Sequence, residues 1–381
     1  MKGAGQLVRV APLLSVMALA ACAAPPPEAL PTPPEPTSAI EAGLMPGPEI
    51  AALNIAPGIA ERARKSFIES CPKLLSRNDR SGIEAYWTPA CEAAPLWAGD
   101  PAGFFAAYFE TAVVGGGGGF ITGYFEPQLA GVRDREPGYD VPVYGLPTDL
   151  VRDPGYSGEG RGPLGRIDEN GSFVPYYERS EIEAGALDGS APIIGWAQDP
   201  VDFFFLQIQG SGQLIAPDGS VVRIGYAGQN GREYVAIGKV LRERGVFAPG
   251  EATMQKIVDW LRANPAQAKD IMDQNRSWVF FRELAGDGPL GALEVPVRPR
   301  ASVAADPRFV PLGAPVWIDA ASDIADGLWI AQDTGGAIKG ANRFDTFWGA
   351  GAEAKEIAGG MSSDARVLIF LPRGTLARMA R

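Results

Sequence analysis

The chain is patterned mainly as short strand-like segments. Some alternate apolar and polar residues, the period of a strand with one buried face, and others are short apolar runs. Such segments lie at 119–127, 141–144, 173–177, 201–209, 221–226, 278–281, 314–318, 328–331 and 366–371. Turns rich in Pro and Gly separate them, and 48 Gly and 34 Pro are typical of many short strands rather than a helical bundle. The sequence therefore predicts a mainly β fold with a few helices.

Apolar residues three and four positions apart predict helices at 61–75, 101–114, 231–245 and 251–263. The last two are expected to be packing helices, with Trp260 in the core. The second ends at the glycine run 115–119. No Gly-Lys-Ser/Thr follows this run, so it predicts a flexible connector rather than a phosphate-binding loop.

The N-terminus has the pattern of a secretory signal, residues 1–22. Positive charges precede the apolar segment 10–21, which is too short to span a bilayer. The segment ends in Leu-Ala-Ala-Cys, which resembles the bacterial lipobox, in which the cysteine, here Cys22, is lipidated and becomes the mature N-terminus. Ala23 in place of Asp resembles lipoproteins of the outer membrane. An ordinary Ala-x-Ala cleavage site is the alternative.

Residues 23–48 are mostly Ala, Pro and Glu with little aliphatic bulk. Such a composition cannot form a core, so we expect an extended tether. The folded part is expected to start near Glu49.

Cys71 and Cys91 are the only cysteines besides Cys22. In an oxidising periplasm they could pair, and closing that loop would stabilise the fold by roughly 3 kcal/mol. Two buried free thiols are the alternative. These two thiols are too few for a cysteine metal cluster.

Charge and composition exclude several functions. The net charge is −11 and no run of Lys and Arg is interleaved with aromatic residues, so we expect no nucleic-acid partner. The chain has no histidine, which excludes Ser-His-Asp and Cys-His nucleophile systems and His-ligated zinc. Any catalysis therefore falls to carboxylates, and we expect neither a metal nor a cofactor.

The densest group of reactive side chains lies in AQDTGGAIKGANRFDTFWGAG, residues 331–351. Asp333 follows an apolar run and precedes a Gly-Gly turn, as expected at the end of a buried strand. Asp345 lies among aromatic residues that can exclude water and raise its pKa, as a general acid requires. A surface turn in which both aspartates cap backbone amides is the alternative.

Other segments carry polar side chains that suit a ligand. Alternation places Tyr124 and Glu126 on one face of a strand. Gln207, Gln209 and Ser211 suit sugar hydroxyls and acetamides, and they suit turn formation and barrel closure equally well.

Separated motifs, in order along the chain, resemble the membrane-bound lytic murein transglycosylase A (MltA) family. They are GYFEP at 123–127, LQIQGSG at 206–212, GYAGQNG at 225–231, SWVFF at 277–281, DPRFVPLG at 306–313, AQDTGGAIKG at 331–340 and FDTFWG at 344–349. The likeness runs from about residue 60 to the C-terminus. The C-terminal part resembles the three-aspartates (3D) domain, with Asp306, Asp333 and Asp345 as its aspartates.

The resemblance implies two β-barrel domains with a groove between them for a glycan strand. A double-psi β-barrel catalytic domain would comprise 49–127 and 271–381, with the 3D region at about 289–381. A second β-barrel with packing helices, 128–270, would be inserted between these segments.

The resemblance also implies a reaction. One aspartate of the family acts as acid and then as base, and the FDTFWG match gives this role to Asp345, with Asp333 in support. The implied activity is that of a peptidoglycan exotransglycosylase in cell wall remodelling, cleaving the β-1,4 bond between MurNAc and GlcNAc without water to leave a 1,6-anhydro end. The residues expected to bind substrate are Tyr124, Glu126, Gln207, Gln209, Ser211, Asp306 and Phe347.

Other functions stay open from the residues alone. A hydrolytic glycosidase would pair Asp345 with Asp333 or Asp306, which would activate water across about 6.5–9.5 Å. A lipid-tethered, noncatalytic module would bind peptidoglycan in the same groove. The DTG at Asp333 also occurs in aspartic proteases, but it supplies one of the two carboxylates that such an enzyme needs.

The expected partners follow from the same resemblance. They are peptidoglycan strands, the periplasmic face of the outer membrane through lipidated Cys22, and proteins of cell-wall synthesis or division. We expect a monomer.

Overall fold

The computed structural model describes residues 35–379 except 77, 80–81, 159 and 287. The predicted signal 1–22, the lipidation residue Cys22 and the first part of the predicted tether lie outside the described residues. Among the helices that are described, none combines the length and the apolar character that crossing a bilayer requires.

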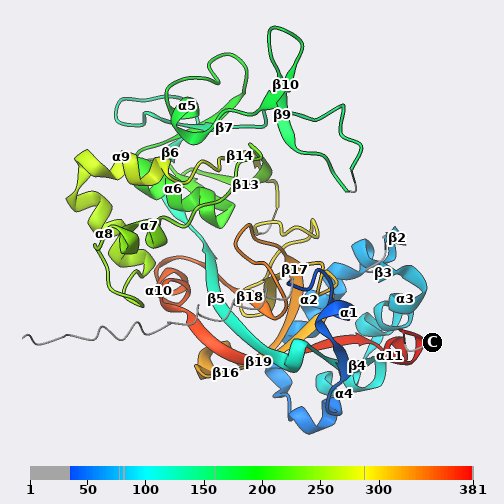
Figure 1. The fold of residues 1–381 in the computed structure, drawn as a ribbon. Coiled ribbons are helices and arrows are strands. Elements are labelled where there is room, and N and C mark those ends of the chain that lie inside the picture. The colour runs from blue at the N-terminus through cyan, green and yellow to red at the C-terminus, as the bar shows by residue number, and fades with distance from the viewer. Residues whose placement is uncertain (1–34, 77, 80–81, 159, 287, 380–381) are drawn as a thin grey trace, which may run out of the picture. The chain divides into compact units, whose positions relative to one another are not determined.

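The larger sheet has the strand order β1-β4-β19-β16-β17-β15-β18-β5 (Figure 1). The strands are β1 Leu44–Pro46, β4 Phe109–Val114, β5 Gly118–Glu126, β15 Ser302–Ala305, β16 Pro315–Ala320, β17 Gly327–Asp333, β18 Arg343–Ala350 and β19 Ser362–Pro372. Because β5 also pairs with β19, the pairings from β5 through β19, β16, β17, β15 and β18 return to β5 in a closed circuit. Strands from both ends of the chain thus build one unit.

The second sheet is built from the middle of the chain, in the order β14-β13-β12-β6-β11-β7. Its strands are β6 Gln128–Val132, β7 Val141–Tyr144, β11 Ile193–Ala197, β12 Ser211–Ile215, β13 Val221–Gln229 and β14 Val279–Glu283. A bridge between Gly145 and Phe281 links its two outer strands. Since β14 pairs with β13, this sheet extends past residue 270, where we expected the insert to end.

Two small β elements complete the sheets. One is β8 Val151–Arg152, β9 Leu164–Ile167 and β10 Phe173–Pro175, and the other is the pair β2 Asn78–Asp79 and β3 Gly82–Ile83.

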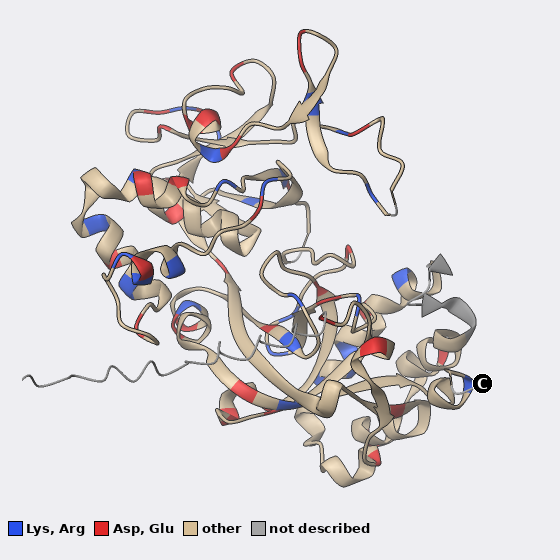
Figure 2. Ribbon diagram, viewed as in Figure 1, with Lys and Arg blue, Asp and Glu red and all other residues tan. Residues whose placement is uncertain are grey.

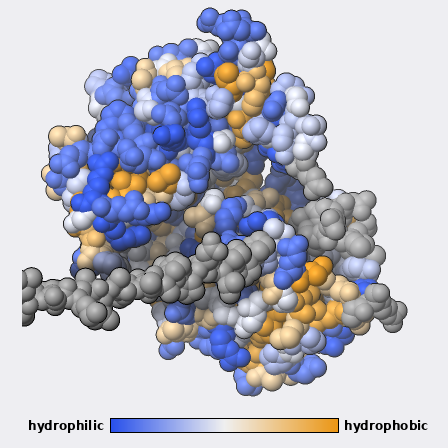
Figure 3. Space-filling view, viewed as in Figure 1, coloured by the Kyte–Doolittle hydropathy of each residue, from blue (hydrophilic) through white to orange (hydrophobic). Residues whose placement is uncertain are grey.

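Basic and acidic residues are interspersed over the ribbon (Figure 2). On the face drawn in Figure 3, hydrophilic residues surround separate hydrophobic patches.

The helices cover the two sheets in separate groups. They are α1 Ala39–Ala42, α2 Pro57–Ser76, α3 Glu84–Ala93, α4 Pro101–Tyr108, α5 Arg179–Glu183, α6 Pro200–Gln209, α7 Ile237–Glu243, α8 Met254–Ala263, α9 Pro265–Asp273, α10 Ala352–Gly360 and α11 Thr375–Met379. Buried residues of α6 to α9, among them Phe204, Leu241 and Leu261, form a core of their own. Trp260 is partly buried against it.

Helices α2, α3 and α4 pack on the larger sheet around Phe67. Its ring meets Phe109 edge-on at 5.5 Å between centroids and lies 5.9 Å from Phe104. A disulfide joins Cys71 in α2 to Cys91 in α3, with their Cα atoms 5.5 Å apart. The sequence had left open whether these cysteines pair, and the structure pairs them.

The segment 201–209, predicted as a strand, is helix α6, so that prediction was wrong. The local signals explain the difference. The Asp199 carboxylate accepts hydrogen bonds from the N–H groups of Val201 and Asp202, and Pro200 occupies the first turn. Gly210, at φ 78°, ends the helix in the left-handed conformation.

The predicted helix 101–114 is half right. Helix α4 stops at Tyr108, and β4, rich in β-branched residues, pairs with β1 and β19. The glycine run is also no free connector, because Gly115–Gly117 form a tight turn with positive φ and the next two glycines begin β5. The pairing of β1 shows that the folded chain begins before Glu49.

The other predicted strands and helices are confirmed within a few residues of their ends, except that the helix predicted at 231–245 begins only at Ile237. Helices α1, α3, α5, α9, α10 and α11 were not predicted. The observed fold is mixed α/β, with more helices than the few expected.

Candidate active site

Strand register brings the two candidate aspartates together. Ala304 in β15 is the partner of Asp333 in β17 on one side and of Asp345 in β18 on the other. Asp345 in turn is the partner of Thr122 in β5. Neighbouring strands lie about 4.8 Å apart, so the two aspartate Cα atoms are separated by about 10 Å. We call this line of four residues the carboxylate row.

Asp345 is partly buried and held by Thr122, whose hydroxyl donates to Oδ1 over 2.7 Å. The same hydroxyl oxygen accepts a hydrogen bond from Arg343 Nη2 over 3.0 Å. Arg343 is itself fixed, because its Nη1 donates to the carbonyls of Phe120 and Phe344. With its acceptor side occupied by Arg343, the Thr122 hydroxyl points its proton at Asp345.

The pKa of Asp345 is raised from 3.8 to about 6. Withdrawal of the carboxyl from water is the main cause, and the nearby charge of Asp333 adds to it. The Thr122 hydrogen bond and the positive charge of Arg343 oppose the rise. A carboxyl with a pKa near 6 can hold a proton and release it close to neutral pH, as acid–base catalysis requires.

Asp333 has the same raised pKa, about 6, and again withdrawal from water is the main cause. Asp333 differs from Asp345 in its hydrogen-bond donors. Oδ1 accepts the N–H groups of Ala292 and Thr334, each over 2.8 Å, and Oδ2 accepts the Tyr124 hydroxyl over 3.1 Å. Each of these donors stabilises the anion, so Asp333 is the better-supported carboxylate of the two.

Aromatic side chains enclose the row. Tyr124 is buried and packs on Phe347 with ring centroids 5.0 Å apart. Burial, then the charges of Asp333 and Asp345, raise the pKa of Tyr124, so it stays a hydrogen-bond donor. Burial, then the charge of Asp345, likewise raises the pKa of Tyr234, which lies just before α7. A residue of the middle segment of the chain therefore lies within electrostatic reach of Asp345.

Asp306, the third predicted aspartate, has a structural role in its loop. Arg308 Nε donates to its Oδ1 over 3.0 Å, and the N–H of Gly340 donates to its Oδ2 over 2.9 Å. Burial raises the pKa of Asp306, but these hydrogen bonds outweigh it and the pKa is lowered. Asp306 thus remains a carboxylate that holds the 331–340 segment in place.

Glu126, Gln209 and Ser211 lie where β5 meets the second sheet. Buried Glu126 accepts from Gln213 Nε2 over 2.9 Å and pairs with Arg223 Nε at 3.1 Å. Burial raises its pKa, against the charge of Arg223. Gln209 Oε1 accepts the Phe125 N–H over 3.0 Å, and Ser211 is buried in β12. These contacts connect the two sheets.

Gln207 is not at the site. It is 3% exposed, accepts from Arg179 Nη1 over 2.7 Å and donates to the Val279 carbonyl. Its amide is therefore used inside the protein, because 201–209 is a helix and not the strand on which the expectation rested. Among the described residues, no group of three or more His, Cys, Asp or Glu side chains is arranged to hold a metal ion.

Sequence reasoning missed the roles of Thr122, Arg343, Tyr234 and Ala304. For two of these residues, the sequence contains a signal that could have indicated the role. Thr122 shares a strand face with Tyr124, and Arg343 precedes Asp345 by two positions, so each lies on the same face as a candidate. No local pattern indicates that β5 and β18 are neighbours, which is why their hydrogen bonds could not be predicted.

The sequence matches the MltA specific insert domain over residues 120–282 and the 3D domain over 301–371. The membrane-bound lytic murein transglycosylase A of Vibrio cholerae is 33% identical over 279 residues, covering 69% of this chain and 69% of that protein. The membrane-bound lytic murein transglycosylase A of Escherichia coli K12 is 32% identical over 261 residues, covering 66% of this chain and 65% of that protein.

Solved structures agree with these matches. A membrane-bound lytic murein transglycosylase from Agrobacterium tumefaciens has a TM-score of 0.75 at 31% identity and covers 84% of this chain and 96% of its own. MltA from Neisseria gonorrhoeae has a TM-score of 0.72 at 36% identity and covers 87% of this chain and 92% of its own. E. coli MltA with bound chitohexaose has a TM-score of 0.62 at 27% identity and covers 81% of this chain and 89% of its own. Together with the carboxylate row, these matches establish that the chain belongs to the membrane-bound lytic murein transglycosylase A family.

Proposed function

We propose that this protein is a lytic transglycosylase that cleaves the β-1,4 bond between MurNAc and GlcNAc in peptidoglycan and leaves a 1,6-anhydroMurNAc end. The observation that carries the proposal is the carboxylate row, in which Asp345 has a pKa near 6 and a single side-chain donor, beside the better-stabilised Asp333. The names of its relatives, and the chitohexaose bound to one of them, support a β-1,4-linked glycan as the ligand.

In the first step, protonated Asp345 gives its proton to the glycosidic oxygen as the bond to C1 of the muramyl ring breaks. Positive charge develops on that ring, and the carboxylate of Asp333 stabilises it. The GlcNAc side leaves with the proton.

In the second step, the C6 hydroxyl of the muramyl residue attacks C1. Asp345, now a carboxylate, takes the hydroxyl proton, so the residue returns to its starting form and no water is consumed. One carboxyl serves both steps because the first leaves it in the form that the second needs. The Thr122 hydroxyl donates to the carboxylate form and thereby favours release of its proton.

The test is digestion of purified sacculi by the wild type and by an Asp345→Asn variant, with mass spectrometry of the released ends. A 1,6-anhydro end that depends on Asp345 supports the proposal. A reducing muramic acid end would assign the protein to the hydrolytic glycosidases instead. Equal release by the variant would leave only a peptidoglycan-binding role.

The finer architecture and location are part of the same proposal. The closed circuit of strands would be the double-psi β-barrel and the sheet built from β6 to β14 the inserted domain, supported by the family matches. Lipidated Cys22 would hold the protein at the outer membrane, where Cys22→Ser should release it into the soluble periplasmic fraction. Attack from strand ends would yield mainly disaccharide products early in digestion, whereas internal attack would yield long fragments.

A further inference from the structure

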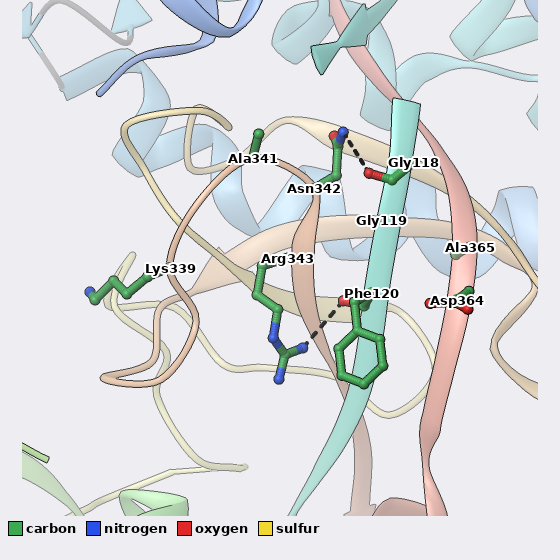
Figure 4. A pocket seen from close by; sticks show the side chains of 9 residues that line it. All are labelled: Gly118, Gly119, Phe120, Lys339, Ala341, Asn342, Arg343, Asp364 and Ala365. Carbon is green, nitrogen blue, oxygen red and sulfur yellow. Dashed lines mark hydrogen bonds between the residues drawn. The ribbon is translucent and has the colours of Figure 1, made fainter. Parts of the chain in front are cut away.

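An open pocket of about 490 Å³ lies beside the carboxylate row, where β5 and β18 begin (Figure 4). It is lined by Gly118, Gly119, Phe120, Lys339, Ala341, Asn342, Arg343, Asp364 and Ala365. Arg343 and Phe120 are register partners, two positions before the Asp345–Thr122 pair on the same strands. The pocket therefore starts about 7 Å from the reacting groups, the repeat of one strand face.

Part of the pocket lining, at Gly118 and Gly119, is bare backbone. Gly118 has an ordinary φ of −72°, and a Cβ added to it would meet nothing within 4 Å. Neither conformation nor packing requires glycine there, in contrast to Gly119, whose Cβ would lie 2.6 Å from the Asn342 carbonyl. A glycine that the fold does not need leaves space for another molecule to approach the chain.

Charged side chains of opposite sign lie on the two sides of this backbone. Figure 4 shows Lys339 on one side of β5 and Asp364, from β19, on the other. Both are exposed, and neither side chain has an ion-pair or hydrogen-bond partner among the described residues. Phe120, 41% exposed, lies below the Arg343 guanidinium at 5.1 Å and adds an apolar surface.

The loop that carries Lys339 is fixed just after this residue, at two positions. Asn342 is buried at a left-handed φ of 55°, and its amide donates to the carbonyls of Val114 and Gly118. The N–H of Gly340, which follows Lys339 directly, donates to Asp306 Oδ2. Lys339 is thus presented by an ordered loop, and its charge is available to a ligand at a defined place.

We propose that this pocket binds the peptide stem of the muramyl residue at the cleavage site, an inference that rests on the proposed transglycosylase function. Such a stem is a short acidic peptide with free carboxylates and, where it contains a diamino acid, a free ammonium. Lys339 pairs with a carboxylate, Asp364 pairs with the ammonium, and Phe120 covers the aliphatic part. The lengths agree, because four residues of β5 from Thr122 to Gly118 span about 13 Å and an extended tripeptide spans about 10 Å.

The experiment compares two substrates: glycan strands that carry peptides, and the same strands after an amidase has removed them. Lys339→Gln and Asp364→Asn should each lower kcat/KM on peptide-bearing strands by about five- to tenfold, the loss of one charge-assisted contact. On stripped strands both variants should match the wild type within about twofold. Lys339→Arg should retain most of the activity, since it keeps the charge.

Lys65→Gln is the matched control, because Lys65 is also an exposed lysine, 71% exposed, on helix α2. An equal loss on both substrates, or no loss on either, would overturn the peptide-stem assignment. Failure of the proposed function has a different signature, since the wild type would then release no anhydro product even from stripped strands. Thermal melting curves of all variants exclude loss of folding as the cause.

Discussion

Strand β5 and helix α6 carry similar alternating sequences, yet they use their polar side chains in opposite ways. In β5, Thr122 donates to the aspartate of the neighbouring strand β18, and Tyr124 donates to the aspartate of β17. In α6, Gln207 turns inward to Arg179, which is 2% exposed. The alternation is the same, and the caps at Asp199 and Gly210 decide the difference.

The two regions also differ in how many hydrogen bonds their charged side chain makes. Arg179 donates to Gln207 and to the carbonyls of Asn275 and Ser277. Asp345 has one side-chain donor. A charge whose hydrogen-bonding groups are occupied holds structure together, whereas a carboxyl with spare capacity in a desolvated place can exchange a proton.

The largest effect is expected at Asp345. Asp345→Asn should lower transglycosylase activity by about 10²- to 10⁴-fold, because the amide cannot carry the proton. The pKa of Asp345 rises from 3.8 to about 6 on folding, so the folded wild type loses stability as pH rises through this window. Denaturant titration should therefore find the variant more stable than wild type at pH 8, by about 1–3 kcal/mol, and no more stable below pH 4.

Arg179→Met should have the opposite signature. Removing the guanidinium leaves Gln207 and two carbonyls without donors, which should lower the free energy of unfolding by about 3 kcal/mol. The folded fraction should keep the wild-type pH profile. Arg276→Met is the control, because Arg276 is 66% exposed and should change stability little. A shifted pH profile in Arg179→Met would show that α6 takes part in the chemistry.

Thr122→Val removes the hydroxyl that donates to Asp345 and keeps the shape of the side chain. Loss of the hydroxyl removes a bond that stabilises the carboxylate, so kcat should fall by about tenfold and the pKa of Asp345 should rise. In a pH–kcat profile, the alkaline limb should move to higher pH. Thr122→Ser keeps the hydroxyl and should keep the limb in place. A uniform loss without a shifted limb would mean that Thr122 only supports the strand.

The smallest effect is expected at Arg343. The proton-donating form of Asp345 is lost as pH rises through about 6, which sets the alkaline limb of the wild type. Arg343→Gln removes a positive charge that lowers this pKa, so the limb should move to higher pH by less than about one unit. The groups facing Asp345 that also titrate or carry charge are Asp333, Tyr124 and Tyr234. Arg343→Lys should retain the wild-type limb, and an equal shift in both variants would rule out the charge effect.

The sequence was informative where function and local pattern coincide. Asp333 follows from an apolar run that ends in a Gly-Gly turn, Asp345 from its aromatic neighbours, and the face shared by Tyr124 and Glu126 from the two-residue period of β-structure. The helix at 201–209 was missed because its Asp-Pro start and glycine end were given less weight than alternation. The role of Ala304 could not be predicted at all, since it depends on three strands meeting in one register.

The closed circuit of strands has a consequence for biosynthesis. Strand β5 is synthesised long before β18 and β19, the two strands that flank it. Until the last strands emerge, Thr122 has no aspartate to donate to, and the middle segment can fold first while β5 is still unpaired. A peptidoglycan-cleaving enzyme built in this way acquires its reactive centre only after β18 has been synthesised.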